Sequence, residues 1–528
     1  MRQVLAIFNK DARRFWPEVL VSFALLVALV RVYPMQWAEP GSIHREIGWF
    51  GISGGPAGVF ATCLVALVPI SWWILIARLI HCEKLVGHTQ FWITRPYEWP
   101  KLVAAKMLFL AVFLYVPFFA AQCLLLHAGG FHPFSYLPGL LLNLVYLTAV
   151  VVLPLAALSG LTTGFGRLTL LILGVILFVV LAATVSDYLP SSTFGSVPDM
   201  VSGKLGFGIL FGGCAAIVLV QYARHRIRLA WFLLAAVAAG VWAIAIFDPD
   251  QTLVASHYPP AASPVQFVYT SGGVTNGTNN KDLLSVSIPM HETGVAEGEA
   301  VVPVALKVNL EGPDGASWQS SWQGISSQRY LAGAPETSMA FVIPRAVYER
   351  FKGVPVTLRM SFALVQARRD FVRVVPLPAG DFTVAGFGVC KAESWTGNID
   401  DFSGIGCRSA MNQPRLTYIT AQWTGGRCAE AASESSRQMG GAAWAGEIDP
   451  EPAEFGITSV WDTPVNISNP WETYHQDESP QRRVLCPGSP VSFTQFRETA
   501  RMQTDLVIRG FRLPELSLGD RYMILHAQ

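Results

Sequence analysis

The chain has 528 residues, of which 52% are hydrophobic and only 14% are charged. Ordinary soluble domains carry about 25% charged residues, so this composition argues against a simple soluble protein. The net charge of +1 gives no basic field for nucleic acid, and we expect no nucleic-acid partner. Long apolar blocks end at about Phe247, and the sequence from Asp248 onward is polar and punctuated by Gly and Pro.

Residues Met1–Arg14 are predicted to form an amphipathic helix on the membrane surface, because their apolar side chains recur at near-helical spacing. Arg13 and Arg14 precede an apolar stretch, as the basic residues of a signal peptide do. No small-residue cleavage site follows, and the stretch ends in Tyr33 and Trp37, which are typical of the membrane interface. We therefore expect a retained first span.

Seven blocks are long and apolar enough, or nearly so, to cross a bilayer, which takes about 20 residues. They centre on Val19–Val32, Val59–Ile80, Leu102–Leu126, Leu137–Leu158, Leu168–Val185, Gly206–Gln221 and Leu229–Phe247. The Gly206 block is short and rich in Gly, but the distribution of charge favours keeping it. We expect a polytopic helical membrane domain of about seven spans over residues 1–247.

Basic residues fall mainly on one side of these spans. Placing the N-terminus in the cytoplasm gives that side the following residues: Lys10, Arg13, Arg14, Arg78, Lys84, Arg95, Lys101, Lys106, Arg167, Arg224, Arg226 and Arg228. Only Arg31, Arg45 and Lys204 lie on the other side. This bias predicts a cytoplasmic N-terminus and, with seven spans, an extracytoplasmic C-terminal half. The membrane that we expect is a bacterial inner membrane.

The spans carry few ionisable groups, which disfavours a carrier with its own intramembrane ion site. Arg78 and Lys106 lie near the cytoplasmic ends, where long side chains can reach water, and Asn143 is the main polar residue at depth. The chain has no Gly-x-x-x-x-Gly-Lys-Ser/Thr phosphate loop. Any ATP hydrolysis would therefore need a partner subunit, and we expect neither an enzyme nor a bound cofactor.

The cytoplasmic loop between the second and third spans, Glu83–Lys106, combines charges, prolines and four aromatic residues. A loop that only solvates its charges would not need these aromatics. We expect a docking site for a partner protein, although an interfacial aromatic belt is the alternative. The candidate docking residues are Glu83, Gly87, Phe91, Trp92, Arg95 and Pro96.

With the N-terminal surface helix, the pattern formed by Glu83, Gly87, Phe91-Trp92, Thr94-Arg95-Pro96 and Lys106 resembles the permease subunits of the type-2 family of ABC transporters. The resemblance covers at most Met1–Phe247. It implies that Glu83–Trp99 couples to a separate ABC ATPase subunit, and that a second permease copy or homologue completes the path. The seventh span and the long outer domain depart from the family's usual six spans.

The C-terminal half is predicted to be β-rich. Residues 248–268 contain several prolines and are expected to form a semi-extended linker. Apolar residues then alternate along Val302–Leu310 and Val354–Leu364, which is typical of strands with one buried face. We expect an all-β, sandwich-like extracytoplasmic domain over 269–528, with a break between two lobes near 381.

Four cysteines fall in this half: Cys390, Cys407, Cys428 and Cys486. An oxidising compartment permits two disulfides, and three pairings remain open; Cys390–Cys407 with Cys428–Cys486 is our first choice. No metal-ligand spacing and no catalytic motif occurs among the His and acidic residues. Two functions remain: a membrane subunit of an ATP-driven exporter or related envelope complex, or a membrane-anchored sensor or scaffold whose outer domain binds a ligand or envelope protein.

Overall fold

The structure is a computed structural model of the whole chain. It describes residues 2–36, 56–82, 98–188, 202–224, 226–247, 249–260, 265–278, 282–325, 330–331, 337–376, 382–384, 388–393, 404–410, 417–425, 439–445, 456–458, 460–465, 483–484, 488 and 490–516. The chain divides into two compact units. The first comprises Met1–Val179, Gly206–Trp242 and Val372–Gln495, and the second comprises Val180–Leu205, Ala243–Phe371 and Phe496–Gln528.

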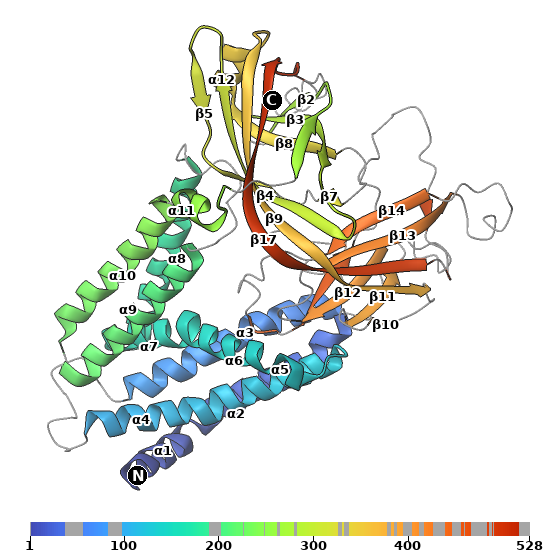
Figure 1. Cartoon of the computed structure of the whole chain (residues 1–528). Coiled ribbons are helices and arrows are strands. Elements are labelled where there is room, and N and C mark those ends of the chain that lie inside the picture. Colours follow the sequence, from blue (N-terminus) through green and yellow to red (C-terminus); the bar gives the residue numbers. More distant parts are fainter. Residues whose placement is uncertain are drawn as a thin grey trace. The chain divides into compact units, whose positions relative to one another are not determined.

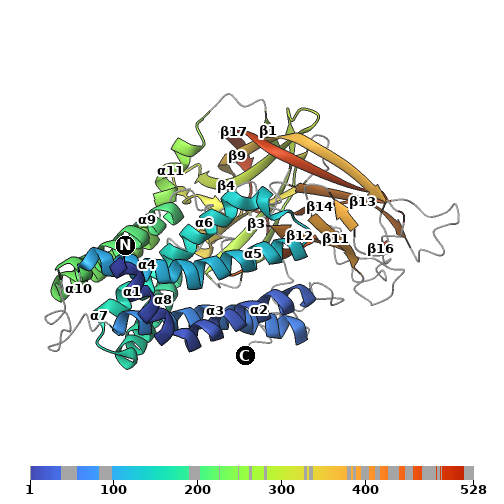
Figure 2. The same ribbon diagram turned by 90° about the horizontal axis from the view of Figure 1, so that it is seen from below.

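The N-terminal half is helical. Its α-helices are α1 (Arg2–Arg14), α2 (Trp16–Gln36), α3 (Pro56–His81), α4 (Trp99–Leu110), α5 (Val116–Ala128), α6 (Leu137–Leu147), α7 (Leu153–Leu161), α8 (Phe165–Tyr188), α9 (Ser202–Arg224) and α10 (Ile227–Phe247). Helices α2 and α3 lie side by side, and α1 packs on α4 (Figures 1 and 2).

Six helical stretches of the described residues are long and apolar enough to cross a membrane. They are Trp16–Met35, Ala57–His81, Trp99–Ala128, Pro133–Leu161, Lys204–Arg224 and Ile227–Ile244. The membrane character predicted from the sequence is thus confirmed for six blocks. Helix α8 lies on the predicted fifth block and has an apolar stretch over Phe165–Leu177.

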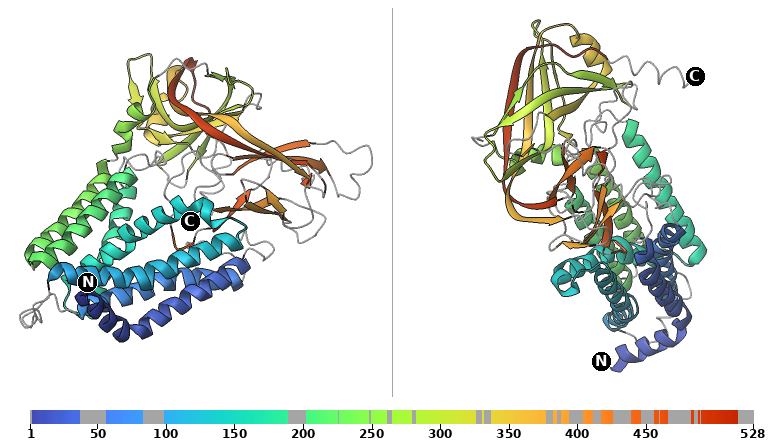
Figure 3. Two further views of the ribbon diagram at one scale, coloured as in Figure 1. Left: turned by 60° about the horizontal axis from the view of Figure 1, so that its bottom comes forward. Right: turned by 90° about the vertical axis from the view of Figure 1, so that its right-hand side faces the viewer.

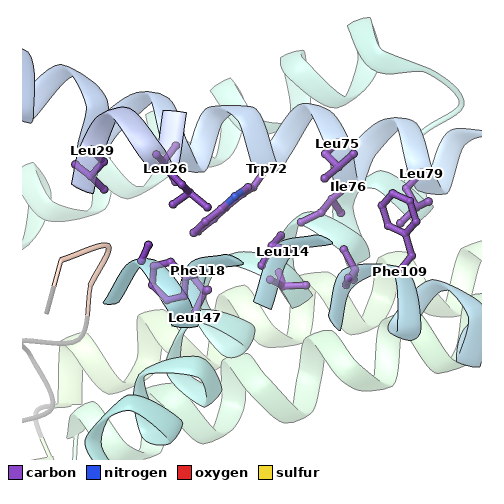
Figure 4. Close-up of a cluster of buried hydrophobic side chains, with 14 of the residues drawn as sticks. Leu26, Leu29, Trp72, Leu75, Ile76, Leu79, Phe109, Leu114, Phe118 and Leu147 are labelled. Carbon is purple, nitrogen blue, oxygen red and sulfur yellow. The ribbon is translucent and has the colours of Figure 1, made fainter. Parts of the chain in front are cut away.

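The helices of the first unit share a hydrophobic core. Its largest fully buried side chain is that of Trp72 on α3, whose ring meets Phe118 of α5 edge to face, with centroids 5.3 Å apart. Figure 4 shows this core, to which α2, α3, α4, α5 and α6 contribute; the labelled residues are Leu26, Leu29, Trp72, Leu75, Ile76, Leu79, Phe109, Leu114, Phe118 and Leu147. In a bilayer such packing supplies contacts that lipid tails would otherwise make.

Two spans contain a π-helical turn. Segment η4 (Ala111–Tyr115) joins α4 to α5, and η6 (Thr148–Val152) joins α6 to α7. A proline follows each segment within two residues, Pro117 in α5 and Pro154 in α7. Because proline lacks an N–H and crowds the preceding turn, it favours a wider turn before it. The two segments meet where the Tyr115 and Thr148 hydroxyls hydrogen-bond at 2.6 Å.

Residues Pro249–His257 form a short helix, α11, where a semi-extended linker was expected. Pro249 occupies the first helical position, where its fixed φ suits a helix and its missing N–H leaves no bond unmade. Pro259 and Pro260 follow the helix and cannot extend it. The prolines in this region therefore bracket a helix instead of preventing one.

The second unit contains a four-stranded antiparallel sheet in which β3 pairs with β1, β2 and β8. The strands are β1 (Gln266–Tyr269), β2 (Val274–Gly277), β3 (Leu283–Thr293) and β8 (Thr337–Pro344); a short helix, α12 (Arg345–Phe351), follows β8. These strands share one hydrophobic core with β4 (Glu299–Glu311), β9 (Val356–Pro376) and β17 (Pro490–Phe511) of a larger sheet. The two alternating patterns predicted from the sequence lie on β4 and β9.

The larger sheet has the strand order β14-β13-β17-β9-β4-β5. The edge of β4 also pairs with β6 (Gln323–Gly324) and β7 (Tyr330–Leu331), while β5 covers Ser317–Gln319. Strands β9 and β17 are 21 and 22 residues long and run beside each other (Figure 3). The buried carboxamide of Gln323 exchanges two 2.9 Å hydrogen bonds with the backbone of Val342 on β8, which ties β6 to the smaller sheet.

The remaining strands, β10 to β16, form what we call the second lobe. They are β10 (Phe382–Val384), β11 (Gly388–Glu393), β12 (Gly404–Ala410), β13 (Thr417–Gly425), β14 (Met439–Ala445), β15 (Val460–Val465) and β16 (Arg483–Val484). Strands β10, β11, β12 and β15 form a sheet in that order. The second lobe falls in the same compact unit as the first seven helices, so the unit boundary differs from the sequence boundary expected at 247.

Candidate partner-docking site

The loop predicted to dock a partner lies outside the described residues, and with it Glu83, Gly87, Phe91, Trp92, Arg95 and Pro96. Its two flanks are described. Cys82 ends α3 by bonding its N–H to the Arg78 carbonyl at 3.1 Å. On the other side Glu98 precedes α4, whose first turn contains Pro100 and an ion pair from Lys101 to Glu98 at 2.7 Å. These two helix ends fix where the loop leaves and re-enters the helices.

A buried ion pair joins the N-terminal helix to the helix that follows the loop. Lys106 on α4 donates to the Asp11 carboxylate on α1, with Nζ 2.7 Å from Oδ2. The Asp11 side chain is 0% exposed and that of Lys106 is 7% exposed. Lys106 also lies 3.8 Å from the Cys82 thiol. One cation therefore contacts α1 and the end of α3 from within α4.

Aromatic packing reinforces this junction. Phe8 of α1 stacks on Phe113, with ring centroids 5.7 Å apart, and meets Phe109 edge to face at 6.4 Å. Phe15, which links α1 to α2, packs edge to face on the same Phe109 at 6.3 Å. The apolar face of α1 is thus occupied by α4 and η4. Its exposed face carries Lys10 and Arg13.

A second ion pair lies on the neighbouring surface. Arg78 of α3 donates to Glu18 of α2, and its guanidinium lies 6.0 Å from the centre of the Phe15 ring. Arg14 approaches the same ring at 5.6 Å. Arg78 is exposed, as the sequence led us to expect, whereas Lys106 is not. The prediction that Lys106 reaches water is wrong, because Asp11 neutralises it inside the helix junction.

Sequence reasoning missed Asp11. The signal was its place on α1: Asp11 follows Ile7 by one helical turn and so falls on the buried face of the helix. An acid on the apolar face of an amphipathic helix requires a buried partner. That partner lies 95 residues away, and spacing alone could not identify it.

Asn143 was expected to be a polar residue at depth, and it is 1% exposed on α6. It is accompanied by Gln122 on α5, also 1% exposed, which sequence reasoning missed. Both carboxamides bond to backbone carbonyls of the second lobe: Gln122 Nε2 to Ile457 O at 2.5 Å and Asn143 Nδ2 to Gly456 O at 3.1 Å. These contacts lie within the first compact unit.

The four cysteines of the C-terminal half are only partly described. Cys390 on β11 and Cys407 on β12 are direct neighbours across the antiparallel pair, and Cys390 is buried. Cys428 and Cys486 lie outside the described residues. Among the described residues, no group of three or more His, Cys, Asp or Glu side chains is placed to hold a metal ion.

No family model matches the chain, and no curated protein matches it.

Proposed function

We propose that the chain is a membrane-spanning, permease-like subunit of an ATP-driven exporter or related envelope complex, without an ATPase of its own. The observation that carries the proposal is the buried ion pair between Asp11 of α1 and Lys106 of α4, the helix that follows the loop; Lys106 also contacts Cys82 at the end of α3, the helix that precedes it. A loop that transmits force to helices needs rigid attachment points. The ion pair and the phenylalanines around it supply that rigidity.

The orientation follows from the same proposal. The N-terminus, α1 and the docking loop face the cytoplasm, where an ATPase subunit would bind, and α8 completes seven spans. The β region then lies outside the cytoplasm as a sandwich-like domain in two lobes. Charge bias supports this orientation, and the core shared by the two sheets supports the sandwich. A second permease copy or homologue would complete the complex.

An extracytoplasmic location permits disulfides. We propose the pair Cys390–Cys407, supported by the register that places the two residues opposite each other on β11 and β12. Directly opposed residues of an antiparallel pair have Cα atoms about 4.5–5.5 Å apart, within the range for a disulfide. Cys428–Cys486 is the remaining pairing.

The second candidate function is a membrane-anchored sensor or scaffold. The contacts from Gln122 and Asn143 to the second lobe favour it, because they connect an outer binding domain to the spans without requiring transport. The two candidates differ in what binds at the cytoplasmic loop, so a partner test separates them.

The test is purification of the tagged chain from membranes of its native cell, followed by identification of bound ATPases. The triple variant Phe91→Ala, Trp92→Ala and Arg95→Ala should lose the ATPase. Phe134→Ala is the control, because Phe134 is 80% exposed in another helix connection. A natural chain that purifies without any ATPase, in a gentle detergent and in native nanodiscs, would refute the transporter proposal.

Topology is tested with reporters fused after Arg228 and after Asp250. We expect cytoplasmic activity at the first position and extracytoplasmic activity at the second. Cytoplasmic activity at both positions would refute the proposed orientation of the β region.

A further inference from the structure

Gln122 and Asn143 form a surface that binds peptide backbone. The two carboxamides come from successive spans, on α5 and α6, and they donate to two consecutive carbonyls, those of Gly456 and Ile457. Both bonds are made to backbone atoms, so the two carboxamides bind the backbone of Gly456 and Ile457, just before β15.

Apolar residues around these two hydrogen bonds pack the second lobe against the helices. Val460 at the start of β15 is 0% exposed and belongs to the same core as the helices, with Ile457 packed against it. A Cβ added to Gly129 would lie 3.1 Å from Val460 Cγ1. One added to Gly130, whose φ is +85°, would lie 2.5 Å from Val389 Cγ2 on β11. Glycine at these two positions lets the second lobe approach the end of α5.

Both carboxamides are buried, so breaking their hydrogen bonds costs more free energy than it would at the surface. A buried carboxamide that loses its hydrogen-bond partner in apolar surroundings is strongly disfavoured. Separating the second lobe from α5 and α6 would break both hydrogen bonds together. The second lobe and the two spans are therefore coupled: a displacement of the lobe that breaks these bonds destabilises the packing of α5 and α6 as well.

We infer that Gly456, Ile457 and Val460 form a latch that fastens the second lobe to α5 and α6, with Gln122 and Asn143 as the hydrogen-bond donors. The occupant of the surface is this segment of the same chain. A ligand or envelope protein that pulls on the second lobe would act on two spans through this latch. The inference does not depend on the chain being a transporter.

The first test measures backbone amide exchange in β15 (Val460–Val465) of the full chain in nanodiscs. Gln122→Leu and Asn143→Leu each remove one hydrogen bond and should raise exchange about fivefold, and the double variant about thirtyfold. Gln221→Leu is the matched control, because Gln221 is a 4% exposed carboxamide on α9 that packs against Gly160 of α7. Unchanged exchange in the double variant, or an equal rise in Gln221→Leu, would overturn the latch.

The second test leaves Gln122 unchanged and measures only whether positions 143 and 456 lie close together. In membranes, the pair Asn143→Cys and Gly456→Cys should cross-link under mild oxidation. Thr420→Cys with Ala442→Cys, a directly opposed pair on β13 and β14, is the positive control for the chemistry. Absence of the first cross-link where the control forms would also overturn the latch.

Discussion

Removing one member of the Asp11–Lys106 pair should destabilise the protein more than removing both. The Asp11 side chain is 0% exposed and that of Lys106 is 7% exposed, so water cannot solvate either charge when its partner is removed. Breaking a buried ion pair costs about 3–5 kcal/mol, whereas replacing both members by apolar residues is often neutral or stabilising by about 1–4 kcal/mol. We therefore expect Asp11→Leu and Lys106→Met each to lose about 3–5 kcal/mol, and the double variant to recover most of it.

The measurement is denaturant-induced unfolding in detergent micelles, analysed as a double-mutant cycle. Amide exchange over α1 should rise in each single variant, because α1 loses its attachment to α4. Lys101→Met is the matched control: the same substitution on the same helix breaks the exposed pair with Glu98, whose members are 40% and 65% exposed. Exposed pairs contribute about 0.2–1 kcal/mol. If Lys106→Met costs no more than Lys101→Met, or if the single losses simply add in the double variant, the reasoning fails.

Two further predictions concern the second unit. Burial raises the pKa of the Glu292 carboxyl on β3, against smaller opposing contributions from a backbone hydrogen bond and from His291. In the pH range between its unfolded and its raised folded pKa, the folded state binds more protons, so the free energy of unfolding falls as pH rises. Glu292→Gln should remove this fall in the free energy of unfolding. The measurement is the free energy of unfolding against pH, and the same slope in the natural protein and the variant would contradict the prediction. Gly273→Ala should destabilise more than Gly272→Ala, by thermal unfolding. Both have positive φ, but a Cβ at Gly273 would lie 2.8 Å from the Ser287 carbonyl oxygen, whereas Gly272 faces open space; equal losses would contradict the clash.

The apolar spans were predictable because hydrophobic length is a local property of the sequence. Six of the seven blocks coincide with helices that are long and apolar enough to cross a membrane. The central strands β4 and β9 were predictable for the same reason, since their alternation survives wherever one face is buried. In β9 the pattern of burial alternates from Val356 to Phe362, both faces are buried up to Val365, and both faces are exposed from Arg368 to Val374.

Strand β17 was not predicted, although its 22 residues make it the longest strand described. Its centre carries Arg497, Glu498 and Thr499 in succession, all hydrogen-bonded side chains at or near the surface. This polar centre interrupts the alternation that begins with Val491 and Phe493, so the full length of the strand shows no continuous period of two. Its partner β9 lies more than a hundred residues away in sequence, so only the folded sheet reveals it.

The candidate site shows the same limit. The aromatic loop was visible in the sequence because unusual residues cluster there. Asp11 and Gln122 were not, because each is a single polar residue whose role depends on a partner far along the chain, at Lys106 and Ile457. A lone polar side chain in an apolar helix signals that a partner exists, but it does not say where.

The π-helical segment η4 affects how this span can be compared with others. A π turn holds one residue more than an α turn, and each residue of an α-helix advances by about 100°. Rewinding Ala111–Tyr115 as α-helix without removing a residue would turn all that follows by about 100° about the helix axis. Gln122 would then face away from the Ile457 carbonyl that it binds, while Phe109 on the other side of η4 kept its place. Any alignment of this span with an uninterrupted helix must therefore open a one-residue gap at η4 for both of its ends to match.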